Sequence, residues 1–211
     1  MAFTFFFRDK YTLELLAQHI IPDLKRRRYI NIWDAGCAMG PEPYSLAIML
    51  RENMTHFLFR NVKIYATDID ENGQFGKIIA HGIYPEVRIK RIPPALLSKY
   101  FSPALPPEDA AYPMTQTANY FQVSEELKRA IRFQQHDLLS LKPVREEFAL
   151  IVCKNVLLHF KPEERARVVR MFHSALAQGG YFVTEQTQKL PDETQRLFQP
   201  VTSAGQLFQK V

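Results

Sequence analysis

An apolar strand that turns through glycine into a helix constrains the fold of this chain most. The predicted strand Tyr29–Asp34 leads to two glycines in a GxxxG spacing, Gly36 and Gly40, and a helical pattern follows over Pro43–Glu52. Glycine tolerates a tight turn and lets a ligand approach bare backbone, beside N–H groups that no helical hydrogen bond uses. The segment therefore predicts the first strand–turn–helix unit of an α/β ligand-binding domain.

A second apolar strand, Val62–Thr67, ends at Asp68. In α/β nucleotide folds an acidic residue at that strand end binds a ribose diol, so the two strand ends together indicate an adenosine-containing cofactor. The glycine spacing matches neither GxGxxG nor GxxxxGK[ST], and it favours a nucleoside with an amino-acid tail, S-adenosylmethionine. The alternative is structural: the glycines permit close packing of helix on strand, and Asp68 caps the next helix.

Strands and helices alternate along most of the chain, which predicts an α/β fold with a doubly wound, mostly parallel sheet. Phe148–Cys153 is almost continuously apolar, as expected of a central parallel strand covered on both faces. Gln178–Gly180 is expected to stop the long helix before it. The other predicted helices are 10–28 (interrupted near Pro22), 71–80, 94–100 and 162–177, and the other strands are 120–123, 131–135 and 180–185, with 196–202 and 206–211 as a terminal antiparallel hairpin.

Residues 82–126 interrupt this alternation and are rich in proline. They are expected to form a small inserted subdomain, or an elaborated surface loop, within a single domain that spans residues 1–211.

Charge and cysteine usage exclude several classes. The net charge is +5, but the basic run Lys25–Arg28 ends a helical pattern and has no interleaved aromatic residues, so no nucleic-acid partner is expected. No apolar run approaches the roughly 20 residues of a membrane helix, so no membrane insertion is expected. Cys37 and Cys153 are expected as free buried thiols in a reducing, cytoplasmic compartment. No Cys/His cluster has metal-ligand spacing, so no metal is expected.

Several motifs in one order, from Thr4 to Val211, make the chain resemble the CheR-type methyltransferases, which methyl-esterify glutamates of bacterial chemoreceptors. The family's Thr-x-Phe-Phe-Arg motif corresponds to Thr4–Arg8, and its Ala-Gly-Cys-Ser-Thr-Gly-Glu-Glu-Pro-Tyr-Ser signature corresponds to Ala35–Ser45. The further motifs are Ala66–Asp70, Gly82–Pro85, His136–Leu139 and Cys153–Leu157.

The resemblance implies a Rossmann-like methyltransferase sheet, S-adenosyl-L-methionine as cofactor and S-adenosyl-L-homocysteine as product. It also implies a chemoreceptor, or another protein with acceptor glutamates, as partner. The implied cofactor residues are Thr4 and Arg8 at the methionine end, Ala35, Gly36, Cys37 and Glu42 around the amino-acid moiety, Asp68 with Ile69 at the ribose, Asp137 and Leu138 at the adenine, and Asn155 and Val156 beneath the sulfonium.

The implied chemistry needs no catalytic triad. A glutamate side chain, whose ordinary pKa is about 4.3, is ionised at neutral pH and requires no general base. Catalysis can then come from holding nucleophile, methyl group and sulfur in line. Arg8 is expected to orient the incoming carboxylate through paired hydrogen bonds, and only loosely, because tight ground-state binding would slow the reaction. Taken singly, Arg8 fits a surface ion pair, Asp137 a helix cap and Asn155 a turn.

The chain departs from the family pattern around the cofactor. It begins at the Thr-x-Phe-Phe-Arg motif, without the helical N-terminal domain that helps engage the receptor, and Ala2 stands where a cofactor-contacting Asn is common. Ala38-Met39 replaces Ser-Thr and Pro41 replaces the first Glu of the signature, which is expected to weaken cofactor binding without abolishing it. Gln186–Gln188 replaces the family's His-Ser-Glu.

A further departure lies near the donor methyl, where His159 replaces a Tyr of the family. His159 is expected either as a general base for an alcohol, phenol or amine acceptor, or as a structural histidine. The alternatives to glutamate methylation are therefore a methyltransferase of the same fold with a small-molecule or other non-receptor acceptor, and a non-catalytic S-adenosylmethionine-binding module.

Overall fold

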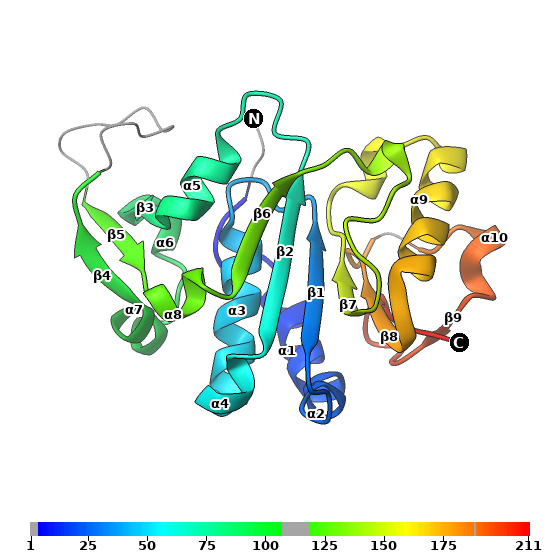
Figure 1. The fold of residues 1–211 in the computed structure, drawn as a ribbon, viewed down its shortest axis with the longest axis horizontal. Helices are drawn as coiled ribbons and strands as arrows, with labels where there is room; N and C mark the ends of the chain where they lie inside the picture. Colours follow the sequence, from blue (N-terminus) through cyan, green and yellow to red (C-terminus); the bar gives the residue numbers. More distant parts are fainter. Residues whose placement is uncertain (1–3, 107–118, 188) are drawn as a thin grey trace.

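A seven-stranded sheet forms the centre of the computed structural model, which describes residues 4–106, 119–187 and 189–211. Its strands are β1 (Ile30–Ala35), β2 (Val62–Asp68), β6 (Ile131–Gln135), β7 (Phe148–Val152), β8 (Leu176–Val183), β9 (Phe198–Pro200) and β10 (Leu207–Lys210). They lie in the order β6-β2-β1-β7-β8-β10-β9 (Figure 1). The first five run parallel, and β10 pairs antiparallel with β8 and β9. The predicted doubly wound sheet with a terminal hairpin is confirmed.

Ten α-helices occur within the described residues, and several of them pack on the sheet (Figure 1). They are α1 (Lys10–His19), α2 (Ile21–Leu24), α3 (Pro41–Asn53), α4 (His56–Phe59), α5 (Phe75–His81), α6 (Glu86–Ile89), α7 (Pro94–Tyr100), α8 (Glu125–Lys128), α9 (Pro162–Ala175) and α10 (Asp192–Gln195). Over the ranges that the structure describes, no helix has the length and apolar character to cross a membrane.

The two faces of the sheet bury separate cores, because successive side chains of a strand point to opposite faces. Ile32 of β1 belongs to the core shared with α1 and α3, whereas its neighbour Trp33 belongs to the core shared with α9. Trp33 is fully buried, and its indole N–H donates to the Thr67 hydroxyl at 2.8 Å. This bond ties β1 to β2 at their carboxyl ends.

A second, antiparallel sheet lies at the opposite end of the molecule from β9 (Figure 1). It consists of β3 (Ile83–Pro85), β5 (Tyr120–Val123) and β4 (Phe101–Ala104), in that order. It stands where the sequence predicts a small inserted subdomain, although residues 107–118 of that stretch are outside the described ranges. Only β5 was predicted as a strand; β3 and β4 were not.

Several helix boundaries differ from the sequence-based expectation, and two of them have a clear physical reason. The helix expected from Glu71 begins at Phe75, because the Asp70 carboxylate accepts the backbone N–H groups of Gln74, Phe75 and Gly76 and so fixes a later start. Asp68 therefore does not cap this helix.

The long helix α9 ends at Ala175, before the glycine pair that was expected to stop it. Gly179, with φ +67°, lies inside β8, next to a register irregularity between β7 and β8. A Cβ on Gly180 would come within 2.8 Å of the Phe148 carbonyl oxygen. The glycines therefore serve a strand irregularity and a close strand contact rather than a helix end.

Candidate functional site

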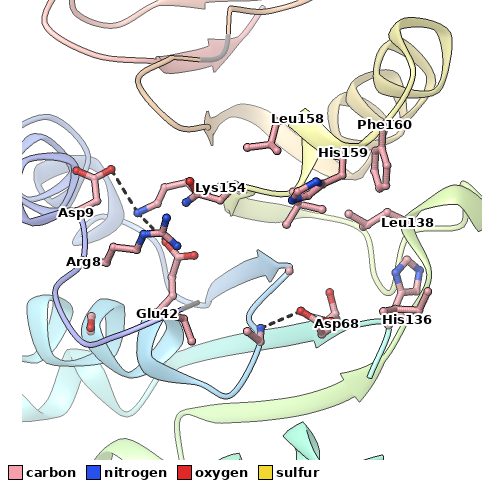
Figure 2. Close-up of a pocket in the computed structure, with 18 of the residues that line it drawn as sticks. Arg8, Asp9, Glu42, Asp68, His136, Leu138, Lys154, Leu158, His159 and Phe160 are labelled. Atoms are coloured by element: carbon pink, nitrogen blue, oxygen red, sulfur yellow. Dashed lines mark hydrogen bonds and ion pairs between the residues drawn. The ribbon is translucent and has the colours of Figure 1, made fainter. Parts of the chain in front are cut away.

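A cavity of about 660 Å³ opens at the carboxyl ends of β1, β2, β6 and β7 (Figure 2). Five segments line it: residues 4–13, the Gly36 turn with the start of α3, and the segments that follow β2, β6 and β7. Strand β1 stands between β2 and β7, so the chain leaves β1 at the point where the order of the sheet reverses. Ligands of open α/β sheets bind at such a point, and the volume falls within the roughly 300–1,000 Å³ of small-molecule sites.

Two positions of the Gly36 turn strongly favour glycine. Gly36 and Gly40 have φ values of +97° and +98°, which side chains rarely adopt. A Cβ on Gly36 would lie 2.1 Å from Cγ2 of Val156, and one on Gly40 would lie 2.6 Å from Cγ1 of Ile79. The N–H groups of Gly36 and Cys37 both donate to the Thr67 carbonyl, at 2.7 and 3.0 Å. These two donors hold the turn against β2.

Asp68 lies on the cavity wall with most of its acceptor capacity available to a ligand. Its Oδ2 accepts the Ala38 backbone N–H at 2.8 Å, which orients the carboxylate against the Gly36 turn (Figure 2). An ionised carboxylate has about four lone-pair positions. The group can therefore accept hydrogen bonds from two neighbouring hydroxyls without losing the bond that positions it.

A buried ionic cluster forms the polar end of the cavity. Lys154 Nζ lies 2.7 Å from Glu42 Oε1 and 3.5 Å from Asp9 Oδ2, and its side chain is only 7% exposed (Figure 2). Burial favours the neutral amine, but the charges of Glu42 and Asp9 prevail and raise the pKa of Lys154. Burial of Asp9 is likewise outweighed, by Lys154 and by hydrogen bonds from Thr12, so the pKa of Asp9 is lowered. Arg8 lies beside this cluster (Figure 2).

Asp34 lies at the end of β1 and is fully buried. Neither of its carboxyl oxygens has a hydrogen-bond partner among the described residues. Burial, reinforced by the Glu42 and Asp68 charges and opposed by Lys154, raises the pKa of Asp34 well above its ordinary value. Glu42, Asp68 and Lys154, whose charges act on this carboxyl group, line the cavity, whereas Asp34 itself does not.

The opposite end of the cavity is apolar and is bordered by Leu138, Ile69 and Leu139. Leu138 is buried, whereas Ile69 and Leu139 are 50% and 42% exposed. Asp137 lines the same end, and its Oδ1 accepts the Leu139 N–H at 2.8 Å, so it caps the short 3₁₀ helix that starts at Leu138. Exposed apolar side chains around a slot suit a flat ring system.

Most of the residues implied by the resemblance line this one cavity: Thr4, Arg8, Gly36, Glu42, Asp68, Ile69, Asp137, Leu138, Asn155, Val156 and His159. Ala35 and Cys37 do not; both are 1% exposed, and they belong to the cores on opposite faces of the sheet. Their side chains point into these cores because of the pleat of β1 and the turn, so a role of Ala35 and Cys37 at the amino-acid moiety stays a prediction and would involve their backbone.

Two cavity residues that the sequence reasoning missed belong to the polar end: Asp9 and Lys154. Lys154 comes two residues after the apolar strand β7, and a charged residue just beyond the carboxyl end of a central strand was a usable signal. Asp9 adjoins Arg8 and is the N-cap of α1, where its carboxylate accepts both the N–H and the hydroxyl of Thr12.

Comparison with known proteins shows which family this chain belongs to. Residues 2–206 match the family described as CheR methyltransferase, SAM binding domain. The chain is 29% identical over 203 residues to a probable chemotaxis protein methyltransferase of Rhizobium etli, covering 93% of this chain and 70% of that protein. It is 35% identical over 188 residues to a chemotaxis protein methyltransferase of Borreliella burgdorferi, covering 85% of this chain and 62% of that protein.

Among solved structures, magnesium protoporphyrin IX methyltransferase of Synechocystis with bound SAH superposes with a TM-score of 0.43 at 15% identity, over 83% of this chain and 54% of the other. The chain spans only part of the length of its curated relatives, 62% in the Borreliella protein. It belongs to the CheR methyltransferase family and contains that family's S-adenosylmethionine-binding domain.

Proposed function

We propose that this domain transfers the methyl group of S-adenosylmethionine to a carboxylate, most simply the side chain of a protein glutamate. One observation carries the proposal: the same cavity is lined by the oriented Asp68 carboxylate, by Arg8 and by the ionic cluster of Lys154, Glu42 and Asp9. The relatives are named as chemotaxis methyltransferases, which supports a chemoreceptor as the acceptor protein. The two buried free thiols, Cys37 and Cys153, support action in the reducing cytoplasm.

The residues on the cavity fit the cofactor of the family. Asp68 can accept two ribose hydroxyls, while Glu42 and Lys154 offer one charge of each sign to a zwitterionic amino-acid tail. The Gly36 turn leaves the backbone bare where a Cβ would meet Val156.

Positioning is the main contribution of these side chains to catalysis. Bound S-adenosylmethionine supplies an activated methyl group, and its transfer leaves S-adenosylhomocysteine. Arg8 can hold an acceptor carboxylate through paired guanidinium hydrogen bonds, and the acceptor needs no base because it is already ionised. Leu158 and Phe160 line the cavity near His159 and make its wall there apolar (Figure 2).

A second function has its own supporting observation. His159 lines the cavity and is exposed at the end of a 3₁₀ helix, Leu157–His159. An imidazole in this place could remove a proton from an alcohol, phenol or amine of a small molecule or another non-receptor acceptor. The two functions differ in their product, since a carboxyl methyl ester releases methanol in mild alkali, whereas an ether or N-methyl product does not.

Calorimetric titration of the protein with S-adenosylmethionine, followed by radiolabelled methyl transfer to a chemoreceptor preparation, tests the proposal. Alkali-labile label supports glutamate methylation, and alkali-stable label supports the second function. Asp68→Ala should weaken cofactor binding by about 100-fold or more, because bonds from two hydroxyls to a charged acceptor are lost. Glu71→Ala removes an exposed carboxylate outside the cavity lining and is the matched control. Near-normal affinity of the Asp68 variant would contradict the ribose role.

A further inference from the structure

Glu185 binds the turn that follows β7 and does not itself line the cavity. Glu185 Oε2 accepts the backbone N–H of Asn155 at 2.9 Å and the hydroxyl of Thr184 at 2.9 Å. Glu185 comes two residues after β8 and is 7% exposed. A carboxylate at the end of one strand thus binds the turn at the end of the neighbouring strand.

The backbone held in this way is strained. Asn155 has φ +59°, a left-handed conformation that residues other than glycine adopt uncommonly, although asparagine tolerates it better than most. The Cys153 N–H still donates to the Val183 carbonyl at 2.9 Å, as a continuation of the ladder between β7 and β8. Two residues later the chain has turned, and the Glu185 side chain supplies the acceptor. Such strain persists only when the surroundings enforce it.

The same turn forms part of the cavity wall. Lys154, Asn155 and Val156 all line the cavity, and Lys154 carries the ion pair with Glu42. Val156 fills the space that a Cβ on Gly36 would occupy, so the turn after β7 and the Gly36 turn fit directly against each other. A displacement of Asn155 would therefore move both a cavity wall and the neighbour of the Gly36 turn.

We propose that Glu185 is a positioning residue of the cofactor site, which acts by fixing the left-handed turn at Asn155 through its backbone N–H. This inference rests on the proposed function, because the wall that Glu185 positions is the wall of the S-adenosylmethionine cavity. The role requires an acceptor oxygen rather than a net charge. A glutamine oxygen has two lone pairs and can accept both hydrogen bonds, whereas alanine can accept neither.

The test compares Glu185→Gln and Glu185→Ala with the wild type in the whole chain. Glu146→Ala, which removes an exposed carboxylate outside the cavity lining, is the control. Calorimetry measures the Kd of S-adenosylmethionine, and NMR measures hydrogen exchange at the amides of Asn155 and Cys153. We expect Glu185→Ala to raise Kd by about tenfold, with rapid exchange at Asn155 and retained protection at Cys153. Glu185→Gln should stay within about threefold of the wild type and keep Asn155 protected.

Three results would overturn the positioning role. Glu185→Ala could bind like the wild type, Glu185→Gln could bind as poorly as Glu185→Ala, or Cys153 could lose protection together with Asn155. The second result would indicate a role of charge, and the third a role in global stability alone. A wild-type chain that fails to bind S-adenosylmethionine refutes the proposed function instead, so the two failures are distinguishable.

Discussion

Replacing Gly36 by alanine should destabilise the domain for two separable reasons. Alanine at φ +97° costs roughly 1–2 kcal/mol of backbone strain. The new Cβ would lie 2.1 Å from Cγ2 and 3.3 Å from Cβ of Val156. Because valine is stiff at χ1, it can relieve the overlap only by an unfavourable rotamer or a backbone shift, at about 1–3 kcal/mol. The expected total is about 2–5 kcal/mol, a large part of a typical domain stability.

Urea denaturation separates the backbone strain from the steric overlap, and it is applied to Gly36→Ala, Val156→Ala, the double variant of these two, and Gly73→Ala. Gly73→Ala is the matched control, because Gly73 has φ +62° and a Cβ added there would meet nothing within 4 Å, so only the strain of about 1–2 kcal/mol applies. Adding Val156→Ala to Gly36→Ala should recover the overlap part, seen as a favourable coupling of about 1–3 kcal/mol in a double-mutant cycle. The reasoning fails if Gly36→Ala costs no more than Gly73→Ala, or if the cycle shows no coupling.

Three further predictions concern Lys154, Asp34 and His159. Lys154→Met leaves the carboxylates of Glu42 and Asp9 without their buried cation and should cost about 3–5 kcal/mol in urea denaturation, partly restored by adding Glu42→Gln. Because the pKa of Asp34 is raised in the folded state, the ligand-free protein loses stability as pH rises from about 3.8 through the folded-state pKa. The Asp34→Asn variant should therefore have a higher melting temperature than the wild type near neutral pH and the same melting temperature at more acidic pH. A higher melting temperature of the wild type near neutral pH would contradict this. His159→Tyr should preserve or raise methyl transfer to carboxylates, measured as alkali-labile label; complete loss of activity would identify His159 as a base for a different acceptor.

The sequence could predict those parts of the site that depend on local pattern. The strand that ends at Ala35, the glycine turn and α3 follow one another directly, so their geometry follows from residue types and spacing. Asp68 was placed at the cavity because it ends the next apolar strand. The same local reasoning could not show that Asp70, and not Asp68, binds the first N–H groups of α5. The Asp68 carboxylate accepts the distant Ala38 N–H, whereas the Asp70 carboxylate accepts the Gln74 N–H, and only the folded structure shows this division.

Contacts between segments that are distant in the chain could not be predicted from the sequence. The ion pair of Lys154 with Glu42 exists because β7 lies beside β1, and no periodicity in either segment indicates the partner. The expected helix stop at Gly179 failed for the same reason, since the need for glycine comes from the neighbouring strand β7 rather than from the helix. The bond between Glu185 and Asn155 likewise depends on the pairing of β7 with β8.

The indole of Trp33 has a practical consequence. It belongs to the single tryptophan of the chain and donates to the hydroxyl of Thr67, a residue that lines the cavity. Light absorbed at the long-wavelength edge of the indole band therefore excites one fluorophore, which is shielded from solvent. Its hydrogen bond to Thr67 connects it directly to the cavity wall. The molecule carries its own optical probe, and occupancy can be followed without attaching a dye.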